Sequence, residues 1–395
     1  MKRRDLIKAL PALPLSLAGR LYAAGPARQR SRFLLVFLRG GYDCVNLLVP
    51  VSSSFYHESR PNIAIARPGP VLTSALPLDA DWGLHPVLRD SLYPLWNAGQ
   101  VAFIPFAGTD DASRSHFATQ DSIELGQPAG DTRNFQSGFM NRLAGLLGGG
   151  GAIAFTDQLP LVFRGSQAVP NLALRSITRP AIDARQRSII TAMYSDTPLA
   201  APVSDGFAVR EEVARELGTE MEAASRNAIS ARGFELESRR IARLMRDKFA
   251  LGFVDVGGWD THVGQGGASG YLAGRLDELG RGLAAFADEL GAQWADTTVV
   301  VVSEFGRTFR ENGNRGTDHG HGSVYWVLGG NVRGGRIAGE QIRLDAAALF
   351  QNRDLPVLNE YRRLLTGIFG RLYGLTPGQL ASVFPGVPAL DLALV

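Results

Sequence analysis

Five short apolar runs divide the chain, at residues 33–38, 101–106, 251–256, 297–302 and 324–328. Continuous apolar runs of this length are typical of strands that are buried on both faces of a sheet. The fourth run reads Thr-Thr-Val-Val-Val-Val, and β-branched residues favour strands. We therefore predict one strand at each of these five positions.

Amphipathic segments lie between the apolar runs. Within 270–290, apolar residues recur at helical spacing, namely Leu272, Leu276, Leu279, Leu283, Phe286 and Leu290. Further helical patterns cover 87–96, 115–124, 138–147, 361–375 and the charged stretch 209–247, where a break is expected near Gly233. Strands that alternate with helices predict one α/β domain over 32–395, with a mainly parallel central sheet, helices on both faces and an inserted helical region at about 205–250.

The first 24 residues have the pattern of an export signal. Arg3-Arg4 precedes an apolar run at residues 9–18, and Ala23-Ala24 offers a small-residue cleavage site. The run is too short to span a bilayer. The paired arginines favour the twin-arginine route over a Sec signal. We therefore expect a loose mature N-terminus at 25–31, contact with the twin-arginine export machinery, a periplasmic or extracellular location and no stable transmembrane segment.

Removing this signal changes the charge balance. The full chain has 41 basic and 38 acidic residues. Residues 1–24 hold five of the basic and one of the acidic residues, which leaves 36 against 37 in the mature chain. A nearly neutral mature chain gives no support to a nucleic-acid partner. The single cysteine, Cys44, excludes an internal disulfide and favours a small buried residue over a reactive thiol.

Polar clusters follow the predicted strands, and they contain the residue types that bind metal. In open α/β sheets, sites form beyond the carboxyl ends of the strands, so these clusters are expected to meet there. Imidazole and carboxylate groups are ligands of Zn²⁺ and similar cations. The candidate ligands are Asp43 after the first strand, Asp260 and His262 after the third, Glu304 after the fourth, and Asp318, His319 and His321 in a glycine-rich loop further on.

The second strand leads into a different cluster, Ser113-Arg114-Ser115-His116. A serine at the start of a helix is either a nucleophile beside a bound anion or simply the helix cap, and the motif alone favours the cap. Arginine binds tetrahedral oxyanions in a bidentate manner. Arg39, Arg114 and Arg307 lie near these strand ends, where each is either a substrate-binding group or one half of a surface ion pair.

Five motifs in this order carry a resemblance to a known family. They are Leu-Arg-Gly-Gly-Tyr-Asp at 38–43, Ser-Arg-Ser-His-Phe at 113–117, Gly-Gly-Trp-Asp-Thr-His at 257–262, Ser-Glu-Phe-Gly-Arg-Thr at 303–308 and Gly-Thr-Asp-His-Gly at 316–320. Together they resemble an uncharacterised family of twin-arginine-exported bacterial proteins that is related to the alkaline phosphatase and sulfatase superfamily. The resemblance covers most of the mature chain and implies an alkaline-phosphatase-like α/β sandwich.

The resemblance also implies roles for single residues. Ser115, or second to it Ser113, corresponds to the nucleophile, with Arg114 and His116 in the same catalytic motif. Asp43, Asp260, His262, Asp318 and His319 correspond to metal ligands, with His321 as a further one. Arg39 and Arg307 are assigned to substrate binding. The implied cofactor is one or two divalent ions, zinc first, with calcium, magnesium or manganese as alternatives.

The sequence departs from the superfamily pattern at one important place. The Asp-His pair that follows the late strand there is replaced by Ser303-Glu304-Phe305, and Asp318-His319 comes a dozen residues later. This leaves open whether Glu304 replaces a ligand or a second metal site is missing. The function expected is therefore an exported metal-dependent hydrolase of phosphate or sulfate esters, on a small-molecule or polymer substrate. The alternative is a non-catalytic exported binding or assembly protein with a degenerate metal site.

Overall fold

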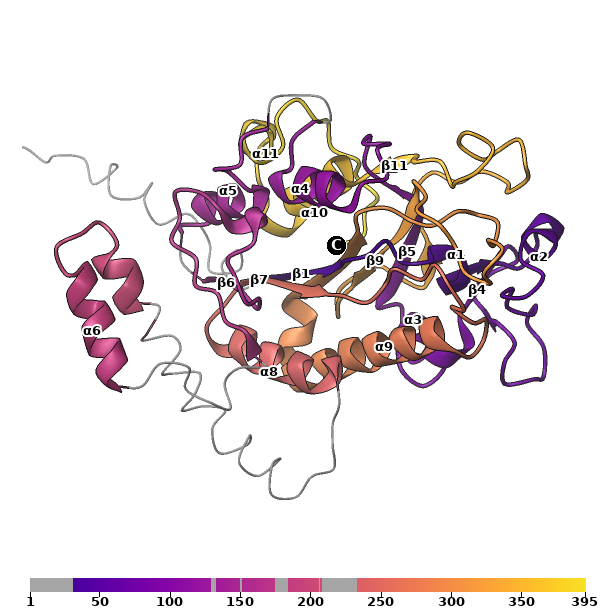
Figure 1. Cartoon of the computed structure of the whole chain (residues 1–395), viewed down its shortest axis with the longest axis horizontal. Helices are drawn as coiled ribbons and strands as arrows, with labels where there is room; N and C mark the ends of the chain where they lie inside the picture. Colours follow the sequence, from indigo (N-terminus) through magenta and orange to yellow (C-terminus); the bar gives the residue numbers. More distant parts are fainter. Residues whose placement is uncertain (1–30, 129–132, 150, 175–183, 206, 208–232) are drawn as a thin grey trace, which may run out of the picture.

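A computed structural model describes residues 31–128, 133–149, 151–174, 184–205, 207 and 233–395 of the chain. A central sheet forms the middle layer, and helices cover both of its faces (Figure 1). The prediction of an α/β fold with a mainly parallel central sheet and helices on both faces is confirmed. The predicted export signal and most of the predicted inserted region lie outside the described residues.

The central sheet contains eight strands within the described residues. Their order across the sheet is β10 (Arg336–Ile337), β5 (Val101–Gly108), β9 (Ser323–Leu328), β8 (Thr297–Ser303), β1 (Arg32–Leu38), β7 (Leu251–Val256) and β6 (Ala152–Ala154), and β11 (Asn359–Glu360) pairs with β5. Among these strands, β9 runs antiparallel to both of its neighbours, whereas the other pairings are parallel. All five predicted strands are present, with ends that differ by no more than two residues.

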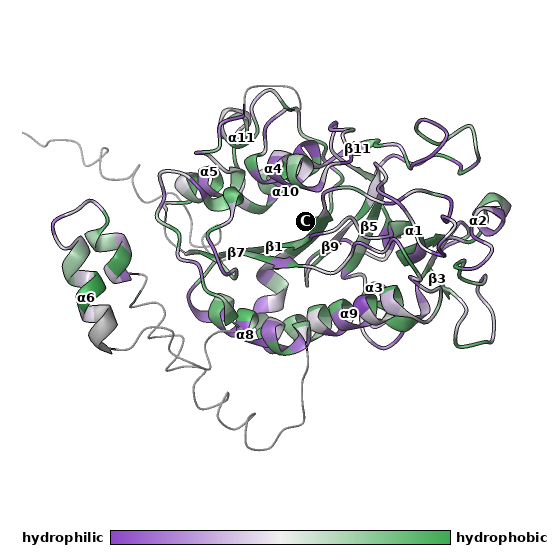
Figure 2. Ribbon diagram, viewed as in Figure 1, coloured by the Kyte–Doolittle hydropathy of each residue, from purple (hydrophilic) through white to green (hydrophobic). Residues whose placement is uncertain are grey.

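The two faces of the sheet bury alternate residues of the same strands. Along β1, Leu34 and Val36 contribute to one hydrophobic core, while Phe33 and Phe37 contribute to the other. Because both faces of β1 are covered, its sequence is continuously apolar rather than alternating. Figure 2 shows hydrophobic residues along the strands and polar residues on the outer sides of the helices.

One face of the sheet is covered by three helices: α3 (Leu92–Asn97), α8 (Phe234–Asp247) and α9 (Tyr271–Leu290). The other carries α4 (His116–Leu125), α5 (Phe139–Leu146), α10 (Tyr361–Tyr373) and α11 (Pro377–Val383). The predicted break near Gly233 is seen as the start of α8, where Gly233 is the N-cap with φ of 93°. The predicted helix at 361–375 is α10, which ends at Tyr373 with Gly374 as its C-cap, and Thr376 then caps the start of α11.

Several short elements were not predicted. A small antiparallel sheet joins β2 (Leu48–Pro50), β4 (Trp82–Leu84) and β3 (Leu76–Pro77). Short helices add α1 (Cys44–Leu47), α2 (Ser54–Ser59) and α6 (Ala184–Tyr194). The predicted helix at 87–96 is a 3₁₀ turn, Pro86–Leu88, followed by α3. Among the described residues, no helix combines the length and the apolar character needed to cross a bilayer.

Candidate metal centre

The candidate centre lies at one edge of the central sheet. Strands β1, β5, β7 and β8 end at this edge, because they run in the same direction. β9 runs the opposite way, so its beginning lies there. The loop 316–322 precedes β9 and is therefore brought to the loops that follow the parallel strands. A parallel β9 would have started at the opposite edge, so its direction is essential to the site.

Three histidines converge at this edge. His116 is the first residue of α4, His262 follows β7 and His319 precedes β9. The Nε2 atom of His319 lies 3.0 Å from Nε2 of His116 and 3.1 Å from Nε2 of His262. The carboxylate of Asp260 joins them, with Oδ1 2.9 Å from His262 Nε2 and 3.4 Å from His319 Nε2. We call these four residues the donor cluster.

The other ring nitrogen of His116, Nδ1, points away from the donor cluster and has a partner of its own. It lies 2.8 Å from Oε1 of Glu304. Glu304 is fully buried, and the same oxygen accepts hydrogen bonds from the Gly40 amide and from Gln120 Nε2. Burial disfavours the charged form of Glu304, but the hydrogen bonds from His116 and Gln120 outweigh it and lower its pKa. Glu304 is therefore an ionised support of His116 rather than a member of the donor cluster.

The other two histidines are held in the same way. His262 Nδ1 lies 3.1 Å from Oδ1 of Asp318, and His319 Nδ1 lies 3.1 Å from the backbone oxygen of Arg114. Arg114 has a φ of 55°, which is uncommon for a residue with a side chain. Asp318 is ionised, because hydrogen bonds from Asn312 and His262 lower its pKa against the effect of burial. Asp318 thus holds the His262 ring from outside the donor cluster.

These contacts settle the direction of each imidazole. A carboxylate or carbonyl oxygen can only accept a hydrogen bond, so the three Nδ1 atoms carry the hydrogen in the neutral rings. Each Nε2 atom then presents a lone pair to the others and to Asp260. Burial and the charge of Arg307 lower the pKa of His319, which favours the neutral form of that ring. The facing lone pairs of His116 and His319 cannot bond to one another, and they need a proton or a cation between them, whereas His262 Nε2 also has Arg307 Nη1 at 3.4 Å.

Three members of the donor cluster, His116, Asp260 and His319, lie close enough together to share one metal ion. Four ligands at ~2.0–2.1 Å from zinc lie ~3.3–3.4 Å from each other. The ligand atoms of His116, Asp260 and His319 all lie within 4.8 Å of one another. The Nε2 atom of His262 lies 3.1 Å from that of His319 and 2.9 Å from Asp260 Oδ1. Imidazoles whose outer nitrogens are held by carboxylate or carbonyl oxygens are the usual arrangement around bound metal.

Arg307 holds the loops around the cluster together, and its Nη1 atom lies 3.4 Å from Nε2 of His262. It is fully buried. It donates to the backbone oxygens of Gly40, Gly41, Trp259 and Thr317 and to Oδ1 of Asp260. This charge and the hydrogen bond lower the pKa of Asp260 against the opposing effect of burial. The prediction of substrate binding by Arg307 is therefore corrected to a structural role.

Two glycines of the 316–320 motif are required by close packing. A Cβ atom on Gly316 would lie 2.4 Å from the carbonyl carbon of His262, and one on Gly320 would lie 2.4 Å from that of Arg307. Both contacts are to backbone, which cannot move aside cheaply. The glycines of this motif therefore allow its loop to pack against the loop that carries His262.

Asp43 is not brought into the donor cluster. It is fully buried and forms an ion pair with the equally buried Arg60, with hydrogen bonds of 2.5 Å to Oδ2 and 3.0 Å to Oδ1. Gln265 Nε2 donates to the same Oδ2 at 2.6 Å. Both carboxylate oxygens are thus used by the protein. The prediction of a metal ligand at Asp43 is corrected to one half of a buried ion pair.

The two serines of the second cluster act as caps in this structure. Ser115 is the N-cap of α4, and its Oγ accepts from the Ala118 amide at 3.5 Å. Ser113 Oγ accepts from the Ser115 amide at 3.3 Å. Both serines are exposed. The Arg114 side chain pairs with buried Asp354, so the contribution of this motif to the cluster is His116 together with the Arg114 carbonyl.

Two further predicted residues also lie outside the cluster. His321 is buried against the ring of Phe350, at 4.8 Å between ring centroids, although it was predicted as a ligand. Arg39 pairs with Asp255 and Glu124, and was predicted to bind substrate. These pairings correct both assignments.

Several residues that matter here were not predicted. Gln120 and Asn312 hydrogen-bond to Glu304 and Asp318, and Arg60 and Gln265 fix Asp43. They lie in segments that have no recognisable motif. Gln120 is the exception, because it lies one turn after His116 on a predicted helix. Residues at this spacing lie on the same face of a helix and can share a partner.

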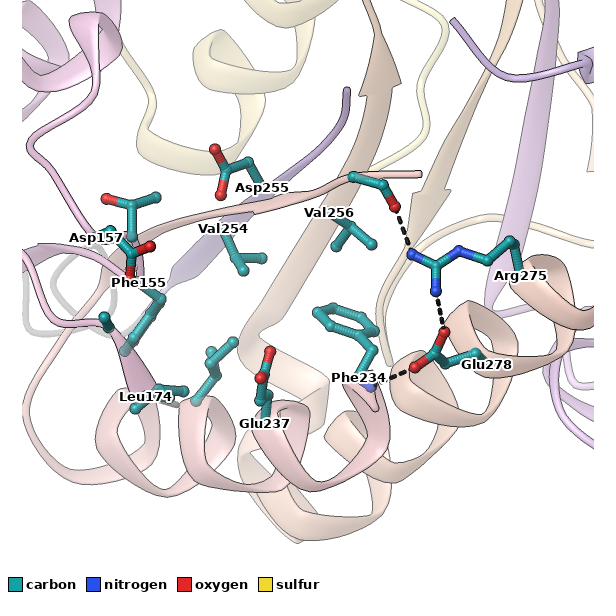
Figure 3. Close-up of a pocket in the computed structure, with 14 residues that line it drawn as sticks. Phe155, Asp157, Leu174, Phe234, Glu237, Val254, Asp255, Val256, Arg275 and Glu278 are labelled. Atoms are coloured by element: carbon teal, nitrogen blue, oxygen red, sulfur yellow. Dashed lines mark hydrogen bonds and ion pairs between the residues drawn. The ribbon is translucent and has the colours of Figure 1, made fainter. Parts of the chain in front are cut away.

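Two cavities lie apart from the donor cluster. A cavity of about 320 Å³ lies between the end of β7 and the helices α8 and α9, and Figure 3 shows residues that line it. Arg275 crosses it and pairs with Glu278 at 2.6 Å. A second cavity, of about 730 Å³, lies between β4 and residues 341–345. No member of the donor cluster lines either cavity.

Comparison with solved structures gives likenesses of general architecture. A protein in the alkaline phosphatase superfamily from Vibrio parahaemolyticus is 11% identical, with a TM-score of 0.38, over 87% of this chain and 66% of its own. The protein Ps i-CgsB in complex with k-i-k-neocarrahexaose is 8% identical, with a TM-score of 0.35, over 91% and 75%. The chain thus spans about two thirds of the length of the first.

Ps i-CgsB without that ligand gives 10% identity and a TM-score of 0.31, over 88% of this chain and 73% of its own. At these TM-scores, the chemistry of the site has to be derived from its own side chains. No curated protein matches the chain. A family model described as "Protein of unknown function (DUF1501)" matches residues 30–384, which is nearly the whole length. The chain therefore belongs to the DUF1501 family.

Proposed function

We propose that this protein is an exported, metal-dependent hydrolase of phosphate or sulfate esters. The observation that carries the proposal is the donor cluster, in which three imidazole Nε2 atoms and one carboxylate face each other while every Nδ1 atom is committed to an acceptor. Three histidines and one aspartate are a zinc-type donor set. The ester class rests on the resemblance of the five motifs, and export rests on the pattern of residues 1–24.

The residues of the chain have distinct roles in this proposal. His116, His262, His319 and Asp260 would hold the ion, and Glu304, Asp318 and the Arg114 carbonyl keep the three rings in the required orientation. When bound, zinc would polarise an ester oxygen and lower the pKa of a water molecule. The side chains of Asp260 and Asp318 are about half exposed, so the site is open to both water and substrate.

We propose water rather than Ser115 as the nucleophile. Ser115 Oγ caps α4, and the structure gives it no contact with the donor cluster. The Ser115→Ala variant separates the two possibilities. With water as the nucleophile, kcat for an aryl ester stays within about threefold of wild type. A loss of several orders of magnitude would assign the attack to the serine.

The function itself is tested by turnover. The purified mature protein, loaded with Zn²⁺, should hydrolyse an aryl phosphate or an aryl sulfate faster than the His319→Ala variant treated in the same way. Zn²⁺, Mn²⁺, Mg²⁺ and Ca²⁺ are compared in parallel. Absence of turnover with all four ions would contradict the proposal.

A second candidate is an exported binding or assembly protein that keeps the metal without catalysis. The observation that favours it is that neither of the two cavities described above is lined by the donor cluster. The two functions differ in one result. The non-catalytic protein binds zinc at the donor cluster, yet its turnover equals that of His319→Ala.

A further inference from the structure

A buried hydrogen-bond network joins the two loops that carry most of the donor cluster. The side-chain oxygen of Gln265 accepts from Thr261 Oγ1 at 3.1 Å and from Thr317 Oγ1 at 3.0 Å. Its amide nitrogen donates to Asp43 Oδ2 at 2.6 Å. Gln265, Thr317 and Asp43 are fully buried, and Thr261 is 3% exposed. A single amide therefore bridges three segments that are far apart in the sequence.

The two threonines lie next to residues of the donor cluster in the sequence. Thr261 lies between Asp260 and His262, and Thr317 lies two residues before His319. The Thr317 amide also donates to the Thr261 backbone oxygen at 3.1 Å. Further backbone bonds join the same segments, from the Gly264 amide to Asn314 O and from the Gln265 amide to Arg315 O. The side-chain bonds to Gln265 add to these and lie directly beside the residues whose donor atoms must converge.

The orientation of the Gln265 amide is determined by its neighbours. Asp43 is held as a carboxylate by two hydrogen bonds from Arg60, and a carboxylate can only accept. The NH₂ group of Gln265 must therefore face Asp43. The carbonyl oxygen consequently faces the two threonine hydroxyls, and the buried ion pair fixes which end of the amide holds the ligand loops.

We propose that Gln265 is a positioning residue for the metal site, which sets the separation between the loops of His262 and His319. The inference rests on the proposed metal site. Asp43, which the sequence placed among the ligands, contributes by orienting Gln265. The network acts through the geometry of the loops and has no contact with substrate.

The Gln265→Met variant tests this role. Methionine has a similar size but removes all three hydrogen bonds. Outer-shell changes weaken metal binding by about 10- to 100-fold, and we expect a loss near the lower end of that range, measured by competition with a chromophoric chelator. The absorption spectrum of the Co²⁺-loaded variant should also change, because altered loop spacing distorts the ligand geometry.

Three further variants distinguish this role from a general loss of folding. Thr317→Val removes one hydroxyl, and a smaller loss of Zn²⁺ affinity is expected. Gln265→Met/Thr317→Val should bind no more weakly than Gln265→Met alone, since both act through one bond. The control is Asn141→Leu, which removes another buried amide, bonded to Phe163 and Gln167. It should lower Tm and leave Zn²⁺ affinity unchanged.

The outcomes separate the inference from the function on which it rests. Wild-type Zn²⁺ affinity and an unchanged Co²⁺ spectrum in Gln265→Met would overturn the inference alone. An equal weakening in Asn141→Leu would also overturn it, because the effect would then be one of general stability. A wild-type protein that binds neither Zn²⁺ nor Co²⁺ would overturn the proposed function together with the inference.

Discussion

Two polar clusters lie at the same edge of the sheet, and they differ in how their lone pairs are used. The donor cluster around His319 is partly exposed, and its Nε2 atoms face one another. The cluster around Asp43 is fully buried, and each carboxylate oxygen receives a hydrogen bond from Arg60. Converging imidazole nitrogens support the proposed cation site, whereas the matched donors and acceptors around Asp43 form a structural unit.

Changes in the cluster around Asp43 should have the largest effect on the stability of the fold. Asp43→Asn leaves the buried Arg60 cation without a counter-charge, and breaking such a pair costs about 3–5 kcal/mol. Urea unfolding of the metal-free protein measures this loss. The double variant Asp43→Leu/Arg60→Met removes both charges and should recover part of it. An unchanged free energy of unfolding in Asp43→Asn would mean that the pair does not stabilise the fold.

The donor cluster should instead respond through metal affinity. Protein zinc sites bind with about 10–16 kcal/mol, so one of four ligands is worth about 2.5–4 kcal/mol. His319→Ala should therefore weaken zinc binding at least about 100-fold, as measured by chelator competition. His321→Ala is the matched control, since His321 packs on Phe350 outside the cluster. Equal zinc affinities in the two variants would contradict the assignment of ligands.

His85 belongs to neither cluster, and it shows how a buried histidine with two backbone partners should affect stability. Both ring nitrogens of buried His85 have backbone partners, at Gly267 and Val87. Burial lowers its pKa to about 4, against an ordinary value of about 6.5. Between these values the unfolded chain binds the additional proton, so stability falls as the pH drops from 6.5 to 4, by up to about 3 kcal/mol.

Urea unfolding of the metal-free protein across pH 4 to 7 measures this dependence. In the His85→Gln variant, which has no imidazole to protonate, the slope over this range should be smaller than in wild type. A variant with the wild-type slope would show that another group is responsible.

The smallest expected effect on zinc affinity comes from changing Glu304, which holds the His116 ring. Glu304→Gln keeps the size of the side chain but removes the charge that holds the Nδ1–H of His116. Such outer-shell changes weaken metal binding by about 10- to 100-fold, and zinc titration should show a loss in that range. A loss as large as that of His319→Ala would indicate that Glu304 is itself a ligand.

The sequence predicted the long strands of the central sheet, but not its short strands. The five long strands were correct because strands buried on both faces have continuous apolar runs. Strands β6, β10 and β11 have two or three residues each, which is too short for a pattern. The antiparallel direction of β9 was not predicted either, because direction is decided by pairing partners and not by local composition.

For the candidate site, residue types were predictable but environments were not. Asp43 and Asp260 both follow parallel strands, and they looked equivalent in the sequence. They differ because Arg60, from an irregular segment, neutralises Asp43 in the interior, while Asp260 faces three histidines. His116 was predicted for catalysis, and only the fold shows that its Nε2 atom meets those of the other loops.

The central claim is that the donor cluster holds a metal ion through three imidazoles and one carboxylate. X-ray absorption at the zinc edge of the zinc-loaded mature protein tests it most directly. The account predicts about one zinc per chain, with imidazole scattering from three histidines at ~2.0–2.1 Å, and its loss in His319→Ala. No zinc uptake, or a zinc ion surrounded by water alone, would contradict the account.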